Sequence, residues 1–324
     1  MTDAPAPAAR SGLRWRRRFA FAHEAALLAL LAGLLAVARV LDPAFVSGEV
    51  QAELLTHVGE TALLALPMTL IVLAGGIDLS VGATMALCAV VLGLAVEAAG
   101  APIPVAVLLA LLVGGAAGAL NGLFVARVRV HPLIVTLATL AAFRGIAEGI
   151  SGGRPISGFP AGFAALGQNN LATGLFVGGA ALTALVLART PLGLWLAAIG
   201  HNEEASRFAG VPVDRIRLGL HALSGLVAAA AAVLFVARRN TAKADIGTGI
   251  ELDVIAMVVL GGTSIFGGRG TIAGTVLGVL VIHETREFVS WHWNRDELNL
   301  VVLGALLILS VLLNRLFSRP PKAP

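Results

Sequence analysis

The sequence predicts an all-α membrane protein with about ten transmembrane helices. Hydrophobic residues make up 57% of the 324 residues and charged residues only 13%, whereas a soluble domain has about 25% charged residues. Most of the chain is divided into apolar runs close to the roughly 20 residues needed to cross a bilayer. Because a core of this size could not bury so much apolar surface, lipid is the expected solvent.

The apolar runs follow one another with short polar connections. In lipid each run must satisfy its own backbone hydrogen bonds, so all are expected to be helices. The run at 254–266 is short, which leaves open a half-helix, a re-entrant piece or a full crossing. The runs cover residues 19–38, 54–74, 79–99, 103–126, 132–150, 171–188, 217–237, 254–266, 271–289 and 298–313.

The basic residues predict the orientation. Ten crossings that start inside place most arginines on the cytoplasmic side, as the positive-inside rule requires. Both termini are then cytoplasmic, with a disordered basic tail at 1–18, one transmembrane domain at 19–317 and a short tail at 318–324. A rival interpretation is a cleaved signal peptide ending at Ala36-Val37-Ala38. Small residues are common in membrane helices, so this pattern also arises by chance.

Several kinds of site are excluded by composition. The net charge of +4 comes from arginines flanking the spans, which favours contact with anionic lipid rather than nucleic acid. Cys88 is the single cysteine, so an intrachain disulfide is impossible, and no metal site or catalytic residues are expected. Neither Lys243 nor Lys322 ends a phosphate-binding glycine loop, so ATP hydrolysis on this chain is not expected.

Two stripes of glycine predict close helix packing. The first consists of Gly114, Gly118 and Gly122, in the fourth run, and the second of Gly270, Gly274 and Gly278, around the ninth. A spacing of four residues places each stripe on one helix face, where backbones can approach. The two runs cross in opposite directions, as a five-plus-five inverted repeat would require. Chance remains the alternative, since the chain has 38 glycines.

Charged residues in or near spans are candidates for function by default. Arg144 and Glu148 are four residues apart, so an ion pair that fixes helix register is the favoured interpretation. Glu60, in the outer third of the second run, either lines a path or extends outward to water.

A glycine motif joins the second and third runs. Gly75 and Gly76 can end one helix through a left-handed turn, and Asp78 or Ser80 can cap the next. The motif therefore predicts either a capped hairpin at the cytoplasmic face or a gating element.

A second glycine cluster follows the short eighth run. It contains Gly261, Gly262, Gly267 and Gly268. It predicts a broken helix and a turn that absorbs a gating motion, with close packing as the alternative.

The polar loop at 200–216 predicts a short exposed helix over 202–209. Asn202 suits its N-cap, and Gly210 followed by Pro212 ends it. Docking on a partner is favoured over a solvated connector, because loops rarely need a capped helix merely to join two spans.

Together these motifs identify a family. From about residue 50 onward the chain resembles the permease subunit of carbohydrate importers of the ATP-binding-cassette class, the ribose, rhamnose and autoinducer-2 type. The marks of the resemblance are Gly-Gly-Ile-Asp-Leu-Ser at 75–80, Asn121-Gly122, His131 through Leu137, the Gly200–Gly210 loop, Asp245-Ile246-Gly247, Gly262 and Phe266-Gly267-Gly268.

The resemblance implies a role for the 200–216 loop as a coupling helix that fits an ATPase subunit. The residues implied in coupling are Asn202, Glu203, Glu204, Ala205 and Gly210, with Ser206 a mild departure from the family pattern. The residues considered for translocation or gating are Gly75, Gly76, Asp78, Ser80, Asn121, Gly261, Gly262, Gly267 and Gly268.

The resemblance also implies partners and a place in the cell. These are a second permease chain, like or unlike, a cytoplasmic ATPase that holds ATP and magnesium, and a periplasmic binding protein, all at the bacterial inner membrane. The outer loops at 151–170, 238–252 and 289–297 are expected to receive the binding protein. The candidate contacts are Trp291, Trp293, Asp296 and Glu297. The sequence does not name the sugar.

Two other classes stay open. An ion-coupled secondary carrier would place acidic pairs at the membrane midplane, and a membrane-embedded enzyme would cluster a nucleophile and a base within spans. Neither pattern is clear in the sequence.

Overall fold

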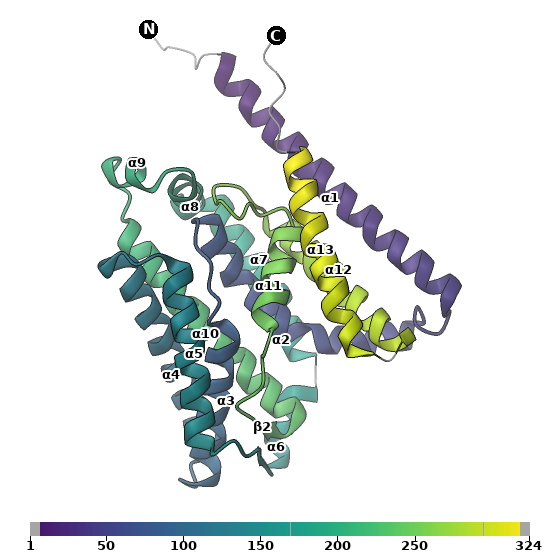
Figure 1. Cartoon of the computed structure of the whole chain (residues 1–324), viewed down its shortest axis with the longest axis vertical. Helices are drawn as coiled ribbons and strands as arrows, with labels where there is room; N and C mark the ends of the chain where they lie inside the picture. The colour runs from purple at the N-terminus through teal and green to yellow at the C-terminus, as the bar shows by residue number, and fades with distance from the viewer. Residues whose placement is uncertain (1–6, 169, 294, 318–324) are drawn as a thin grey trace.

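The computed structural model describes residues 7–168, 170–293 and 295–317 and is almost entirely helical (Figure 1). The elements in chain order are α1 (Pro7–Leu41), α2 (Gly48–Leu73), α3 (Val81–Glu97), α4 (Ile103–Leu123) with a π-helical extension (Phe124–Val128), α5 (Pro132–Ser151), β1 (Ile156–Ser157), α6 (Ala161–Gln168), α7 (Leu171–Arg189), α8 (Pro191–His201), α9 (Glu203–Phe208), α10 (Val213–Arg239), β2 (Thr241–Ala242), α11 (Ile250–Leu260), α12 (Ile272–Trp293) and α13 (Asp296–Phe317).

Each of the ten apolar runs lies on a helix of its own, which confirms the helical membrane character. Among the described residues, six helices are long and apolar enough to cross a membrane. They cover Ala22–Leu41, Gly48–Leu73, Ile103–Val128, Pro132–Ser151, Leu171–Arg189 and Val213–Arg239. The eighth run yields only the 11-residue α11, and its last residues form a loop.

Helix α1 begins earlier than the sequence indicated. It starts at Pro7, so residues 7–18 are helical rather than a disordered tail. Proline suits the first position of a helix because it lacks the N–H that would have no partner there.

The helices separate into a buried centre and an apolar periphery. Helices α2, α3, α10 and α11 are largely buried. By contrast α4, α5 and α7 expose large apolar side chains, among them Leu112 at 60%, Leu137 at 56% and Leu182 at 62%. An exposed apolar surface of this extent is expected of helices that face lipid or a partner chain.

Both glycine stripes lie where helices pack closely, as predicted. A Cβ on Gly118 would overlap with the carbonyl oxygen of His221 on α10. On α12, a Cβ on Gly278 would overlap with the carbonyl oxygen of Met257 on α11. Close packing of this kind holds the helices together in lipid, where the hydrophobic effect does not drive helices to associate.

Gly118→Ala is expected to lower the thermal stability of the full chain in detergent, because one methyl group forces α4 away from α10. Overpacking of this kind costs about 1–3 kcal/mol. Gly145→Ala is the matched control, since no atom lies within 4 Å of a Cβ at that position of α5. Melting curves followed by intrinsic fluorescence compare the two variants with the parent chain. Equal melting temperatures for the two would contradict the packing described here.

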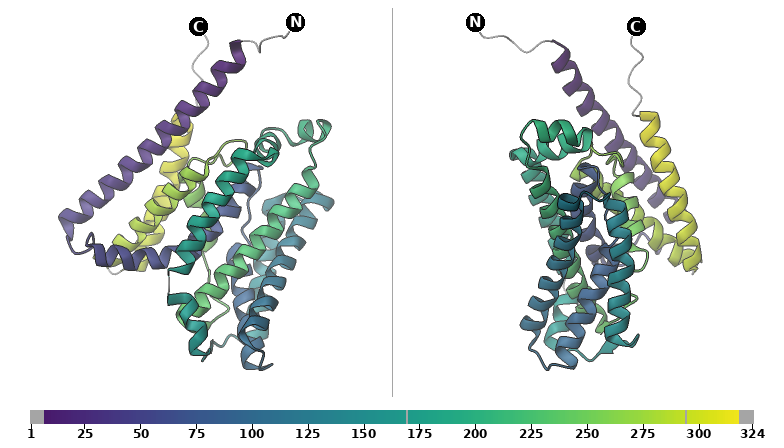
Figure 2. Two further views of the ribbon diagram at one scale, coloured as in Figure 1. Left: turned by 180° about the vertical axis from the view of Figure 1, so that it is seen from behind. Right: turned by 60° about the vertical axis from the view of Figure 1, so that its left-hand side comes forward.

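Different elements of the chain lie at the two ends of the bundle. Helices α8 and α9, the start of α1 and the end of α13 lie toward one end, and α6 with the β1–β2 pair lies at the other (Figures 1 and 2). Strand β1 pairs antiparallel with β2 through Ile156 and Ala242, which ties together two loops far apart in sequence. We call these the α9 end and the β end.

Candidate functional site

Two helices of the bundle begin inside it rather than at its ends. The chain leaves α2 and runs as a non-helical segment, 74–80, before α3 begins, and a second non-helical segment, 243–249, leads into α11 (Figure 1). The second segment meets the start of α3, where a Cβ on Gly82 would overlap with the carbonyl oxygen of Gly247. Non-helical backbone is tolerated at membrane depth only where protein or a water-filled cavity covers it, and broken helices of this kind form the substrate sites of many transporters.

The first segment begins with the turn that the glycines predicted. Gly75 has a φ of +77°, and the N–H groups of Gly75 and Gly76 donate to the carbonyls of Val72 and Ile71 at 2.9 Å each. A left-handed glycine therefore ends α2.

Asp78 is the centre of a buried polar network. Its Oδ1 accepts the backbone N–H of Ser80 at 3.0 Å and the Ser80 hydroxyl at 2.7 Å. Its Oδ2 accepts the Ser224 hydroxyl at 2.8 Å, and Asn121 donates to the Ser80 hydroxyl at 2.8 Å. Asp78 and Ser80, which precede α3, are thereby joined to α4 and α10.

The predicted capping role of Asp78 and Ser80 is therefore wrong. Ser80 occupies the N-cap position of α3, yet its side chain accepts no hydrogen bond from the helix. The hydroxyl is oriented toward Asp78 and Asn121 because these buried groups need partners.

Two buried atoms of this network have no hydrogen-bond partner in the described part of the chain: Asn121 Oδ1 and His221 Nδ1. His221 Nδ1 lies 3.9 Å from Asp78 Oδ2, too far for a hydrogen bond. The sequence motifs predicted Asp78, Ser80 and Asn121 as site residues, but they gave no indication of His221 and Ser224. The available signal was their spacing of three within an otherwise apolar run.

The second segment is held by Arg144 of α5. Its guanidinium donates to the carbonyls of Ala244 and of Ile246, the latter at 2.7 Å. The predicted ion pair with Glu148 is wrong, because Arg144 reaches these carbonyls across the bundle instead.

Glu60 neither lines a path nor extends outward to water, the two alternatives that the sequence left open. It is 3% exposed and forms an ion pair with Arg238 through two hydrogen bonds of 2.6 and 2.8 Å.

Three chain segments meet at the α9 end through glycine backbone, in what we call the glycine junction: Gly75, Gly200, Gly267 and Gly268. The Gly268 N–H donates to the carbonyl of Leu73 at 2.8 Å. A Cβ on Gly267 would lie 2.7 Å from the Cα of Gly200 and 2.9 Å from the nitrogen of Gly75. The end of α2, the end of α8 and the loop after α11 are therefore in direct backbone contact.

The other two glycines of the second cluster pack against helices. A Cβ on Gly261 would lie 2.6 Å from the carbonyl oxygen of Gly274 on α12, and one on Gly262 would lie 2.6 Å from the His23 ring of α1. The break that this cluster predicted is confirmed, since α11 ends at Leu260.

Helix α9 matches the predicted exposed helix. The Asn202 side chain accepts the backbone N–H of Ala205 at 2.9 Å, and Gly210 stops the helix with a φ of +81°. Phe208 is 85% exposed, and Glu204 and Ala205 are exposed as well. An apolar ring presented to solvent beside a carboxylate is typical of a docking surface.

Ion pairs brace α9 against α10. Arg207 contacts Glu203 at 2.9 Å and Asp214 at 2.5 Å, and Arg217 contacts Glu203 at 2.7 Å. The hydrogen bonds to Asp214 and Glu203 raise the pKa of the Arg207 guanidinium above its ordinary value. Glu203 therefore points toward its own chain, which leaves Glu204 as the exposed carboxylate of this helix.

The aromatic candidates for docking lie at the turn between α12 and α13. Trp291 is 46% and Trp293 49% exposed, and Glu297 is exposed. The Trp291 indole N–H donates to Asp42 at 2.8 Å. The side chain of Asp296 lies outside the described part of the chain.

Comparison with known proteins shows the family. Residues 50–311 match the family described as the permease component of branched-chain amino acid transport systems. The chain is 34% identical to the ribose import permease protein RbsC of Escherichia coli (strain K12), over 94% of this chain and 97% of that protein. It is 36% identical to the ribose import permease protein RbsC of Bacillus subtilis (strain 168), over 87% and 89%.

A second kind of relative is the autoinducer 2 import system permease protein LsrD of Yersinia enterocolitica. It is 37% identical, over 77% of this chain and 78% of that protein. No solved structure matches the chain. The broken spans, the exposed apolar helices and the extent of these matches lead to one conclusion: the chain belongs to this family of transport permeases.

Proposed function

We propose that the chain is the membrane permease of an ATP-driven importer for a sugar or a sugar-like solute. The relatives import ribose or autoinducer 2 by name. The observation that carries the proposal is α9, a capped helix that presents Glu204, Ala205 and Phe208 outward between two apolar helices. A permease without a nucleotide-binding loop needs such a surface so that conformational changes of a separate ATPase are transmitted to it.

We infer ten crossings, with both termini and the α9 end in the cytoplasm. The ten apolar runs each occupy a helix, and the arginine excess falls on the α9 side. The third and eighth runs give α3 and α11, each of which begins inside the bundle after a non-helical segment (Figure 1). This correspondence at a separation of five spans supports the five-plus-five inverted repeat.

The proposed mechanism is alternating access. Binding of ATP draws two ATPase subunits together, and α9 moves with the subunit that it contacts. The glycine junction passes this displacement to the ends of α2 and α8 and to the loop after α11, because backbone in direct contact cannot absorb it. The segments 74–80 and 243–249 then shift around the start of α3, inside the bundle.

The proposed assembly contains two permease chains, a cytoplasmic ATPase that binds ATP and magnesium, and a periplasmic binding protein, in a bacterial inner membrane. The binding protein docks at the β end and the α12–α13 turn, where Trp291, Trp293 and Glu297 are exposed.

The test is to purify the tagged full chain from its own membranes in mild detergent and to identify what accompanies it. An ATP-binding-cassette ATPase is expected with the parent chain. Glu204→Arg and Phe208→Asp are expected to reduce its recovery at least about tenfold, since residues at the centre of a docking surface carry about 2 kcal/mol or more. Glu49→Arg is the matched control, an equal charge reversal at an exposed site on α2.

Retention of the ATPase by both α9 variants would refute the docking role of α9. Absence of any ATPase from the parent preparation, with transport that stops when an uncoupler is added, would instead indicate an ion-coupled carrier.

A further inference from the structure

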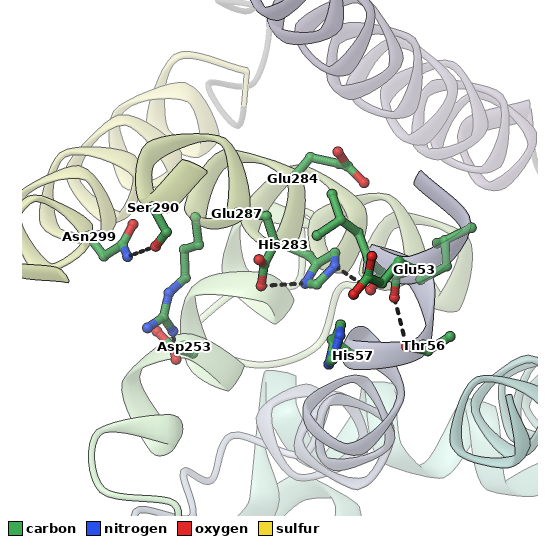
Figure 3. Close-up of polar contacts among 12 residues, drawn as sticks. Glu53, Thr56, His57, Asp253, His283, Glu284, Glu287, Ser290 and Asn299 are labelled. Carbon is green, nitrogen blue, oxygen red and sulfur yellow. Dashed lines mark hydrogen bonds and ion pairs between the residues drawn. The ribbon is translucent and has the colours of Figure 1, made fainter. Parts of the chain in front are cut away.

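A polar cavity of about 190 Å³ lies among α2, α11, α12 and α13. Its polar lining consists of His57, Thr61, His283, Arg286, Glu287, Ser290 and Asn299. In Figure 3 Glu287 lies beside His283, His57 lies below them on α2, and the hydrogen-bonded pair of Ser290 and Asn299 lies to the left. So many polar side chains beside apolar helices are costly unless they serve a ligand or a pathway.

The cavity contains hydrogen-bonding groups with unused capacity. Asn299 donates through Nδ2 to the Ser290 oxygen at 2.7 Å. Its Oδ1 has no hydrogen-bond partner among the described residues, and Asn299 is only 6% exposed. The Ser290 hydroxyl, which accepts that bond, keeps its own proton to donate. The Glu287 carboxylate lies 4.0 Å from His283 Nδ1, so it too can accept. An unpartnered buried acceptor of this kind calls for an explanation, and a ligand supplies one.

The pairing of the lining arginine argues against an anionic ligand, and the arrangement of acidic and histidine side chains argues against a metal ion. The Arg286 guanidinium is paired with Asp253, and Arg238, beside His57, is paired with Glu60. The guanidinium that lines the cavity, that of Arg286, is therefore already engaged by a carboxylate. Among the described residues, no three His, Cys, Asp or Glu side chains are arranged to hold a metal ion.

A neutral solute with several hydroxyl groups fits this arrangement. Each hydroxyl both donates and accepts, so it can donate to Asn299 Oδ1 or Glu287 and accept from Ser290. Met257 and Val58 complete the lining with apolar surface, which suits the C–H face of such a molecule. The cavity holds the volume of roughly six water molecules, the size of a small polyol rather than of an oligosaccharide.

The position of the cavity matches an entry site. Thr61 and His57 lie in the half of α2 remote from the glycine junction, and Ser290 lies three residues before Trp293. The cavity is therefore next to the exposed tryptophans at which we place the binding protein. A solute released there would meet this cavity before the broken spans.

We propose that this cavity is a binding site for a neutral polyhydroxylated solute of about pentose size, with Asn299, Ser290 and Glu287 as its hydrogen-bonding residues. The assignment rests on the proposed function, because it names the class of solute that the permease accepts. It makes the α12–α13 region a selective element in addition to the soluble binding protein.

Thiol labelling of the full chain, purified without any partner, tests the proposal. Ser290→Cys places a thiol in the cavity, and the parent chain serves as the blank because its single cysteine, Cys88, is 0% exposed. A small charged methanethiosulfonate reagent is expected to label Ser290→Cys. D-Ribose is expected to slow that labelling by the factor 1 + [ribose]/Kd, about elevenfold at ten times Kd. Glycine betaine at equal osmolarity, which has no hydroxyl group, should leave the rate unchanged.

Two further variants guard against a folding artefact. Thr61→Cys repeats the test from α2, and adding Asn299→Leu to either cysteine variant should remove the protection while labelling continues. Thr285→Cys is the matched control on α12, since the native Thr285 hydroxyl bonds its own helix at Val281 and the residue does not line the cavity. Its labelling should not respond to ribose.

Failure of the reagent to reach both cavity cysteines, or equal protection by ribose and betaine, would overturn the proposal. Labelling that ribose does not slow would overturn it as well. None of these results depends on an ATPase, so each leaves the test of the importer function unaffected.

Discussion

Gly200→Val is expected to reduce ATP-driven transport by the assembled importer at least about tenfold while the chain still inserts as a helical bundle. A Cβ at Gly200 would overlap with the carbonyl oxygen of Leu73 and the nitrogen of Gly268. These two atoms form the 2.8 Å hydrogen bond that joins α2 to the loop after α11. The added methyl groups must therefore separate the segments that connect α9 to the centre of the bundle.

The magnitude follows from the nature of the contact. Backbone atoms, unlike the end of a flexible side chain, can move only together with their helices. Overpacking here should therefore lower the free energy of unfolding by about 1–3 kcal/mol. Transport is expected to suffer more than stability, because α8 and its neighbour α9 would be displaced relative to α2. The predicted signature is a modest fall in melting temperature with a loss of transport of at least about tenfold, equal to about 1.4 kcal/mol in coupling.

The measurement is solute uptake by proteoliposomes that contain the purified importer, together with ATPase activity and the melting temperature of the permease. Gly219→Ala is the control, since no atom lies within 4 Å of a Cβ at that position of α10. Uptake by Gly200→Val that equals uptake by Gly219→Ala would show that the junction does not transmit motion.

Much of the fold could be predicted because lipid imposes simple rules. Each apolar run must be a helix, and Asn202, Gly210 and Pro212 have local geometric roles that neighbouring residues determine. The start and stop of α9 therefore appeared in the sequence almost as in the structure. The close packing at the glycine stripes could be predicted equally well, since a spacing of four residues defines a helix face without knowledge of the partner helix.

The partners across the bundle could not be predicted. Arg144 was expected to pair with Glu148 on its own helix, yet it binds the carbonyls of Ala244 and Ile246, about a hundred residues away. Glu60 likewise forms an ion pair with Arg238, which lies on α10. Local spacing shows which groups can pair within one helix, but a long guanidinium reaches groups that only the packing brings near.

The path of the chain before α3 was missed for a related reason. Asp78 and Ser80 have the composition of a helix cap, and at a membrane surface that is what they would form. Because 74–80 instead runs into the bundle, their polar groups must be satisfied by α4 and α10. The polar cavity was hidden in the same way, since its residues come from helices that are far apart in sequence.

The second large effect is expected at Asp78. Asp78→Ala removes the acceptor of three hydrogen bonds, from the Ser80 N–H, the Ser80 hydroxyl and the Ser224 hydroxyl. Each buried donor left without a partner costs about 1–3 kcal/mol. Because Asp78 is 2% exposed, water does not replace the carboxylate readily. A total of about 3–5 kcal/mol, large for a single substitution, is therefore expected.

A graded series separates this cause from a general disturbance of the site. Asp78→Asn keeps one acceptor oxygen and should lose less stability than Asp78→Ala. Ser224→Ala removes a single hydrogen bond and should lose about 1 kcal/mol. Glu148→Ala, at an exposed acid on α5, should change nothing. Melting temperatures in this order would establish that the carboxylate holds the start of α3 against α10, whereas a parent-like Asp78→Ala would show that the non-helical segment is held by its backbone contacts alone.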